Sequence, residues 1–256
     1  MSALSNVDLE KELKSTEHIR IYPLTVSNIK GSTYNLTASD YAWSLSTKES
    51  IVSNGVIKIP KHDTGIIATK EVIWVSEKIS GTYHSKVSIV TAGGGHIGTT
   101  LDPTWMGHSI IAVHNHTDDF LEIGVDSTFV SIMFHYLHSP STKIQDNSLS
   151  QIDHLHQFNL TRTQKAYFDT SWKKIPEDLQ RKVKIDTGYK ELEKNMKKDY
   201  NFKAYFSIFI IAVIILSCLY GASNVDKDSF WHILLLFIPN AGFSGILVYY
   251  FIQNKK

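Results

Sequence analysis

Short apolar runs separated by turn residues fill the chain from about residue 19 to residue 137. The runs are rich in Ile, Val, Thr, Tyr and Phe, and they recur at the spacing that is typical of a β-sandwich or barrel. No helical period interrupts them, which argues against a doubly wound α/β sheet. We therefore predict an all-β domain, an antiparallel barrel or jelly roll, preceded by a short helix over residues 3–14.

The part of the chain from residue 141 to residue 203 has a different pattern. Residues 139–165 are polar and rich in turn formers. From about residue 175 onwards, one apolar stripe of coiled-coil type recurs at intervals of four, three and four, at Ile185, Tyr189, Leu192 and Met196. We predict a polar linker and a helical stalk over residues 141–203.

Two apolar stretches without Asp, Glu, Lys or Arg follow, Ala204 to Ala222 and Phe230 to Ile252. Each has about the ~20 residues that a helix needs to cross a bilayer, and the alternative is a buried helical hairpin. Lysines flank the pair at Lys190, Lys194, Lys197, Lys198, Lys203, Lys255 and Lys256, whereas the connecting loop holds only Lys227. We expect a two-helix membrane anchor over residues 204–252 with both termini in the cytoplasm. The N-terminus has no apolar signal-peptide region.

The second apolar stretch carries Pro239 and Asn240 near its middle. Pro kinks a helix, and the small residues Ala241 and Gly245 allow two helices to approach closely. The pattern fits tight packing of the hairpin on itself. It also fits packing between protomers around a path lined by Asn240, since a polar side chain in lipid needs a partner.

Composition excludes several kinds of chemistry. The 26 Lys and Arg residues against 25 Asp and Glu give a net charge of +1, so nothing points to nucleic acid as a partner. The single Cys, Cys218, lies inside the first apolar stretch. That excludes a disulfide framework, a four-cysteine zinc site and the ligand set of the zinc deaminases.

A specific motif is Leu101–Gly107, with the sequence LDPTWMG. It resembles the Ile-Asp-Pro-Gly-Trp-x-Gly signature of the dCTP deaminase branch of the dUTPase superfamily. GIIATKEVIWV followed by EKISGTYHSKVS is similar to the segment in which that family places its phosphate-binding Ser pair. The resemblance covers about half of the chain. It implies a distorted jelly roll over residues 1–140 that forms a homotrimer with nucleotide sites between subunits.

Carried over position by position, the resemblance implies a set of five nucleotide-binding residues. Asp102 falls on the Asp that contacts the sugar 3′-hydroxyl and positions water, and Trp105 falls on the aromatic residue that packs on the deoxyribose. Lys86 and Ser88 fall in the phosphate-holding loop, and Asn35 replaces the Asp of the Ser-x-Asp-Leu segment. No cofactor is implied beyond Mg²⁺ that accompanies a bound nucleoside triphosphate.

The deaminating Glu of that family aligns with Ala112, and Asp102 is the only acid between Ser85 and His116. Metal-free deamination needs a base that activates water and then protonates the departing amine. His114 or His116 could substitute in principle. Otherwise we expect these two histidines to be exposed strand residues and not metal ligands.

Three functions remain open on the sequence alone. The first is a membrane-tethered nucleotide sensor, a pseudoenzyme whose architecture resembles that of prokaryotic antiviral membrane effectors by analogy only. The second is an active dCTP deaminase or dUTP diphosphatase that uses Asp102. The third is a β-rich oligomerisation platform that binds no nucleotide. The sensor is the preferred interpretation because Ala112 stands at the position of the base.

Overall fold

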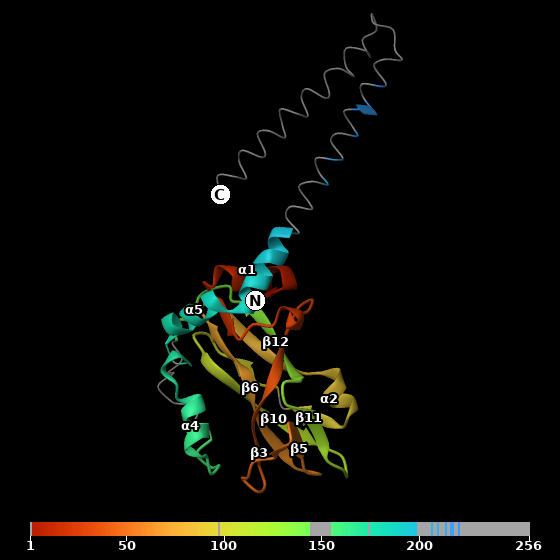
Figure 1. The fold of residues 1–256 in the computed structure, drawn as a ribbon, viewed down its shortest axis with the longest axis vertical. Helices are drawn as coiled ribbons and strands as arrows, with labels where there is room; N and C mark the ends of the chain where they lie inside the picture. The colour runs from red at the N-terminus through yellow and green to blue at the C-terminus, as the bar shows by residue number, and fades with distance from the viewer. Residues whose placement is uncertain are drawn as a thin grey trace, which may run out of the picture. The chain divides into compact units, whose positions relative to one another are not determined.

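The computed structural model describes residues 2–96, 98–143, 155–173 and 175–198, together with six single residues between 206 and 220. Residues 1–193 form one compact unit, and residues 194–256 are assigned to a second. The first unit contains all of the strands, as Figure 1 shows. The prediction of a strand-rich, barrel-like domain is confirmed for this part of the chain, although helices also contribute to it.

The helices and strands are short, apart from four long strands. The helical segments of the first unit are α1 (Asn6–Ser15), η1 (Val26–Asn28), α2 (Val87–Thr91), α4 (Arg162–Phe168), η2 (Ser171–Lys173) and α5 (Pro176–Ile185). The strands are β1 (Ser2–Ala3), β2 (Ile19–Tyr22), β3 (Tyr34–Ser44), β4 (Val52–Ser53), β5 (Val56–Ile59), β6 (Thr64–Val75), β7 (Ile79–Ser85), β8 (Gly94–His96), β9 (Thr100–Leu101), β10 (Met106–Asn115), β11 (Leu121–Gly124) and β12 (Thr128–Tyr136). The predicted helix over residues 3–14 is present as α1, but it begins at Asn6, because a capping box between Ser5 and Asp8 fixes its start.

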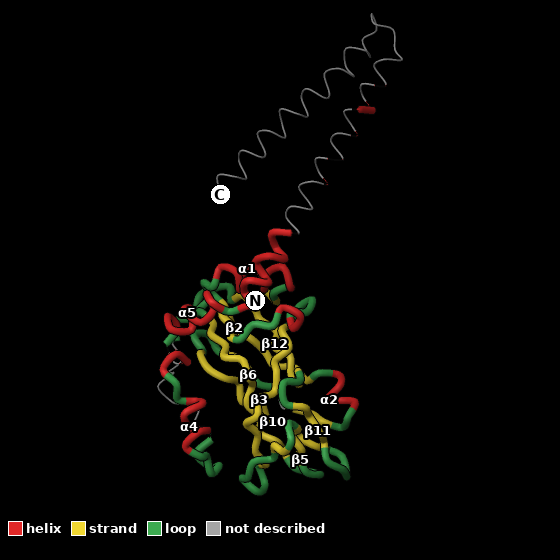
Figure 2. The backbone as a smooth tube through the Cα atoms, viewed as in Figure 1, coloured by secondary structure: helices red, strands yellow, loops and turns green. Residues whose placement is uncertain are grey.

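The main sheet runs in the order β8-β10-β6-β3-β12-β7-β9, and all its pairs are antiparallel. Its two end strands, β8 and β9, are joined by residues 97–99 alone. A connection of that length spans at most about 14 Å, so the sheet has to curl until its ends approach each other. Figure 2 shows the curled strands beside the smaller sheet β11-β5-β4.

The central strand β6 is apolar on both of its faces. Ile67 and Ile73 point into the barrel and are fully buried. On the outer face, Ala68 and Val72 are also fully buried, and Ile66 packs against a buried cluster. A strand with this pattern needs a second layer over its outer face.

That second layer is the segment 155–193, here called the strap. Two apolar clusters hold it on the sheet. One consists of Trp43, Ala68, Leu155, Phe158 and Phe168, and the other consists of Val72, Met106, Leu179 and Val183. The part of residues 141–203 that the strap covers is therefore no linker, and the compact unit ends at Glu193 instead of near residue 140. The apolar residues of the strap are scattered among polar ones. The segment therefore appears polar in the sequence, although its apolar side chains are buried against β6.

The predicted stalk is interrupted. α5 ends at Ile185, and a second helix begins at residue 187 and is described as far as residue 198, so residues 199–203 of the stalk lie outside the described residues. Gly188 lies so close to Leu24 that a Cβ atom there would come within 1.9 Å of the Leu24 carbonyl oxygen. The hydroxyl of Tyr189 accepts a hydrogen bond from the Ile21 amide at 3.0 Å. The first turns of this helix therefore belong to the β domain.

Within the part of the chain that the structure describes, no helix is long and apolar enough to cross a bilayer. Six single residues of the stretch 204–222 are described, and all six are helical. The remainder of that stretch lies outside the described residues. The same holds for the whole stretch 230–252, including Pro239 and Asn240.

Candidate functional site

Two of the predicted nucleotide-binding residues lie on neighbouring parts of one sheet. Asn35 of β3 is paired with Ser131 of β12, whose hydroxyl donates to the Asn35 side-chain oxygen at 2.7 Å. Lys86 follows β7, and its ammonium donates to the hydroxyl of Thr128, also on β12. Both side chains thus already have partners within the sheet.

Ser88 lies two residues beyond Lys86, in α2, for which Lys86 is the N-cap. Asp102 is an exposed residue of the turn between β9 and β10. Trp105 ends that turn, and its carbonyl accepts a hydrogen bond from Val75. Among the described residues, no hydrogen bond links Asp102 or Trp105 to Asn35, Lys86 or Ser88. Whether the five residues form one nucleotide site stays a prediction.

The position of the missing carboxylate has an apolar surrounding. Ala112 lies on β10 opposite Ile66 of β6. Ile66 and Ile110, on the same outer face, pack against the cluster that includes Trp43 and Phe168. His114, the possible substitute, contacts the Thr64 hydroxyl at 2.6 Å through its Nδ1 atom.

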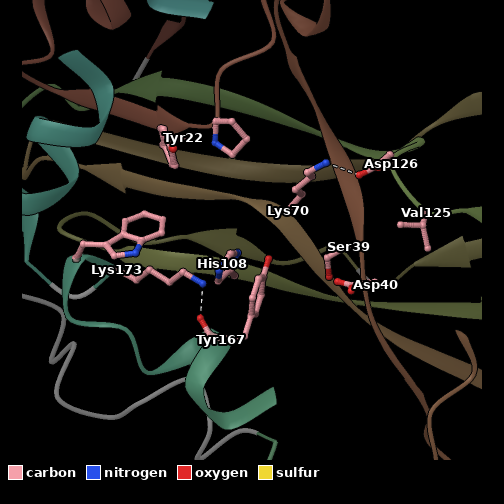
Figure 3. A pocket seen from close by; sticks show the side chains of 11 residues that line it. Tyr22, Ser39, Asp40, Lys70, His108, Val125, Asp126, Tyr167 and Lys173 are labelled. Carbon is pink, nitrogen blue, oxygen red and sulfur yellow. Dashed lines mark hydrogen bonds and ion pairs between the residues drawn. The ribbon is translucent and has the colours of Figure 1, made fainter. Parts of the chain in front are cut away.

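Further along the same outer face, two β-bulges open a cavity. The register of β3 against β6 shifts between Ala38 and Ala42, and the register of β10 against β6 shifts between His108 and Ile110. Bulges redirect side chains and are frequent beside functional sites. Here they leave a cavity of about 420 Å³ between the sheet and the strap. Figure 3 shows the side chains that line it, which are Tyr22, Pro23, Ser39, Asp40, Lys70, His108, Val125, Asp126, Tyr167, Trp172 and Lys173.

Lys173 is the most unusual group in this cavity. Only 6% of the residue is exposed, and its ammonium donates to the backbone carbonyl of Tyr167. The nitrogen also lies 3.6 Å from the centre of the Tyr167 ring and 5.3 Å from that of Trp172. No Asp or Glu forms an ion pair with it among the residues that the structure describes. Burial lowers the pKa of Lys173 to about 8.

Aromatic rings form the walls on either side of this ammonium. Tyr167 stacks on His108 with ring centres 4.6 Å apart, and Tyr22 meets Trp172 edge to face at 5.4 Å. His108 is buried, its Nδ1 contacts the Thr69 carbonyl at 2.9 Å, and burial lowers its pKa to about 3. The imidazole is therefore neutral and acts as part of an aromatic wall.

The other end of the cavity carries acids. Lys70 and Asp126 form an exposed ion pair at 2.5 Å, and Asp40 lies at the solvent-exposed rim beside Ser39. Figure 3 shows these side chains at a distance from Lys173, on the far side of Tyr167. The cavity thus offers a buried cation at one end, aromatic surfaces in the middle and acceptors at the other end.

The sequence analysis missed this cavity because its wall comes from the strap. Tyr167, Trp172 and Lys173 lie in a stretch that reads as a polar connector. The available signal was the sequence AYFDTSWKK, in which three aromatic residues interrupt a polar segment. Because Ser39 and Lys70 are far from this stretch along the chain, nothing in the sequence indicated that these residues line one cavity.

No protein-family model and no curated protein sequence matches the chain. Solved structures do show similarity. The 2′-deoxycytidine 5′-triphosphate deaminase from Agrobacterium tumefaciens has a TM-score of 0.45 and 10% identity over 54% of this chain and 49% of the enzyme. This chain therefore spans about half of that deaminase.

Two dUTPases also show similarity. The EIAV dUTPase has a TM-score of 0.37 and 18% identity, over 51% of this chain and 96% of the enzyme. The dUTPase of Staphylococcus bacteriophage 80alpha has a TM-score of 0.36 and 9% identity, over 51% and 89%. Similarity at this level leaves the function to be inferred from the residues of this chain.

Proposed function

We propose that this chain is a membrane-anchored protein that binds a small anionic ligand, with a nucleotide as the first candidate, and that it does not deaminate that ligand. The observation that carries the proposal is the buried ammonium of Lys173, which faces a cavity with aromatic walls and has no carboxylate beside it among the described residues.

The energetic reason is the cost of burying a charge. A buried ion without a partner is strongly unfavourable, and a backbone carbonyl and an aromatic ring compensate only part of that cost. A phosphate or carboxylate in the cavity would supply the missing charge-assisted hydrogen bond. A planar base could lie against Tyr167 or Trp172, and its N–H groups could donate to Asp40. A nucleotide satisfies all three requirements, and it is also the ligand class that the motif resemblance implies.

The surroundings of Ala112 support the proposed absence of deaminase activity. A deaminase has to hold a carboxylate and a water molecule at the reacting carbon. The outer face around Ala112 instead carries isoleucines that pack under Phe158 and Phe168. This supports a pseudoenzyme that binds its ligand without turnover.

The membrane anchor is supported by the sequence pattern and by six described residues. Phe206, Phe209, Val213, Leu216 and Tyr220 are helical, and each exposes 45–75% of its surface. A helix that exposes large apolar side chains at this density needs an apolar surrounding, and lipid is one. We place residues 204–252 in the membrane, with both termini in the cytoplasm. The strap ends at Glu193 and the candidate anchor begins at Ala204, and we propose that the chain between them connects ligand binding to the anchor.

The test uses the full chain in mild detergent, with dCTP, dUTP, dTTP and cyclic dinucleotides as probes. Melting temperature and reaction products are recorded together. A ligand that binds only the folded state raises the melting temperature, and about 100 times its Kd adds about 2.7 kcal/mol. Lys173→Met should abolish the rise, whereas Lys165→Met, an exposed lysine of the same strap, should not. If no probe raises the melting temperature, or if Lys173→Met binds as well as the native chain, the proposal is wrong.

The alternative function is an active dCTP deaminase or dUTP diphosphatase that works as a homotrimer. It is favoured by one observation: among the described residues, no hydrogen bond links Asp102 or Trp105 to Lys86 or Asn35, as expected if sites between subunits take their residues from different chains. Release of ammonia or pyrophosphate that Asp102→Asn abolishes would establish it. A trimeric mass in light scattering would support the shared sites but would not by itself show turnover.

A further inference from the structure

A second cavity, of about 360 Å³, lies where the chain leaves the β domain. It is a groove between the ends of two helices and the start of a third, lined by Lys14, Thr16, Val183, Lys184, Tyr189, Lys190 and Glu193. Figure 1 shows α1 and α5 together at this end of the domain. We call it the basic groove. It shares none of its lining residues with the strap cavity.

The three lysines of the basic groove are not neutralised by the protein. Lys14, Lys184 and Lys190 are exposed, and none of them forms an ion pair among the described residues. The groove contains one acid, Glu193. The carboxylate of nearby Asp186 is engaged in accepting hydrogen bonds from the amides of Gly188 and Tyr189. The groove therefore carries an excess of positive charge.

Helix dipoles explain only part of this charge. Lys14 lies in the last turn of α1 and Lys184 in the last turn of α5, and cations are favourable at the C-terminal end of a helix. Lys190 lies in the first turn of the helix 187–198, where a cation is unfavourable. An anion bound in the groove would offset that repulsion and would face all three ammonium groups.

We infer that the basic groove binds the phosphate headgroups of an anionic bilayer, an inference that rests on the membrane part of the proposed function. The candidate span begins at Ala204, only 14 residues after Lys190. Fourteen residues reach at most about 50 Å when extended, and about 21 Å as a helix. Lysines held this close to the point of membrane entry meet lipid headgroups at a far higher local concentration than a soluble phosphate, and clusters of basic residues next to a span are attracted to anionic lipid.

The experiment compares lysine accessibility in two kinds of lipid nanodisc. The full chain is inserted into discs of phosphatidylcholine alone and into discs with about one third phosphatidylglycerol, and its lysines are labelled by reductive methylation. Lys14, Lys184 and Lys190 should react at least about fivefold more slowly in the anionic discs, and high salt should remove most of the difference. Lys61, an exposed lysine outside the groove, is the internal control and should react equally in both discs.

A third arm separates lipid from free phosphate. In neutral discs, inorganic phosphate at 10 mM should leave the three lysines unprotected, and protection there would overturn the assignment to lipid. Equal labelling in neutral and anionic discs would overturn it as well. If the chain enters neither disc, the membrane anchor itself is wrong. Sedimentation with anionic vesicles then tests lipid binding by the basic groove independently of the anchor. A triple variant with Lys14→Glu, Lys184→Glu and Lys190→Glu should bind the vesicles at least about tenfold more weakly than Lys61→Glu.

Discussion

The two faces of the main sheet each bury an ionisable group, and the protein treats the two groups differently. Inside the barrel, the Glu71 carboxylate accepts hydrogen bonds from the amide and the hydroxyl of Thr37, at 2.9 and 2.7 Å. On the outer face, the ammonium of Lys173 has a carbonyl and two rings but no carboxylate among the described residues. A buried ionisable group whose hydrogen bonds are satisfied serves the fold. A buried charge that lacks its counter-ion beside a cavity indicates a ligand.

The largest expected effect concerns the layer that creates the outer face. Phe168 is buried against Trp43, Tyr41 and His108, so Phe168→Ala should cost about 3–5 kcal/mol of unfolding free energy. Loss of this contact should also abolish ligand binding, because Tyr167 and Lys173 lose their support. Phe120→Ala removes the same side chain at a site that is 64% exposed, and it should change the free energy by less than about 0.5 kcal/mol. Urea denaturation in mild detergent measures the change in unfolding free energy for both variants. If Phe168→Ala costs no more than Phe120→Ala, the strap is not part of the cooperative unit.

A smaller effect concerns the pH dependence of stability, to which Glu71 inside the barrel and His108 on the outer face contribute with opposite signs. Burial raises the pKa of Glu71 to about 7, so its contribution to stability is full below about pH 4.5 and is lost as the pH rises towards 7. His108 has the opposite sign: its pKa is lowered to about 3, and stability falls on acidification below about pH 6.5. Between about pH 4.5 and 6.5, acidification therefore stabilises the native chain through Glu71 and destabilises it through His108, so the two contributions oppose each other.

Glu71→Gln removes the contribution of Glu71 to the pH dependence of stability. The variant should lose stability on acidification from pH 6.5 to 4.5 more steeply than the native chain, by up to about 1.4 kcal/mol per pH unit. Glu122→Gln, which changes only an exposed ion pair with Lys58, should keep the native profile. Parallel profiles for Glu71→Gln and the native chain would contradict the assigned protonation of Glu71.

The smallest effect is the pH dependence of binding at Lys173. Its ammonium begins to lose its proton near pH 8, whereas nucleotide phosphates are already fully ionised there. The affinity for an anionic ligand should therefore fall above about pH 8, by up to tenfold per pH unit. Calorimetry at pH 7.0, 8.0 and 9.0 measures it. A constant affinity across this range would mean that the ligand does not contact Lys173.

Much of the fold could be read from local patterns. The strands of residues 19–137 follow from short apolar runs and turns, and α1 follows from its capping residues, because both signals depend on neighbours along the chain. The end of the domain could not be read this way. Leu155, Phe158 and Phe168 are scattered in a polar segment, and only their contact with Trp43 and Ala68 shows that they belong to the core.

The sequence by itself determined the strand-rich domain, the apolar stretches near the C-terminus and the absence of a carboxylate at Ala112, since each of these depends on residue type and spacing alone. The tertiary structure decided which charges are buried and what they face. Lys173 and Lys70 are 103 residues apart in the chain and line one cavity. Their position in one cavity depends on the register shifts of β3 against β6 and of β10 against β6 and on the strap that folds over them, and no local pattern encodes a juxtaposition at that separation.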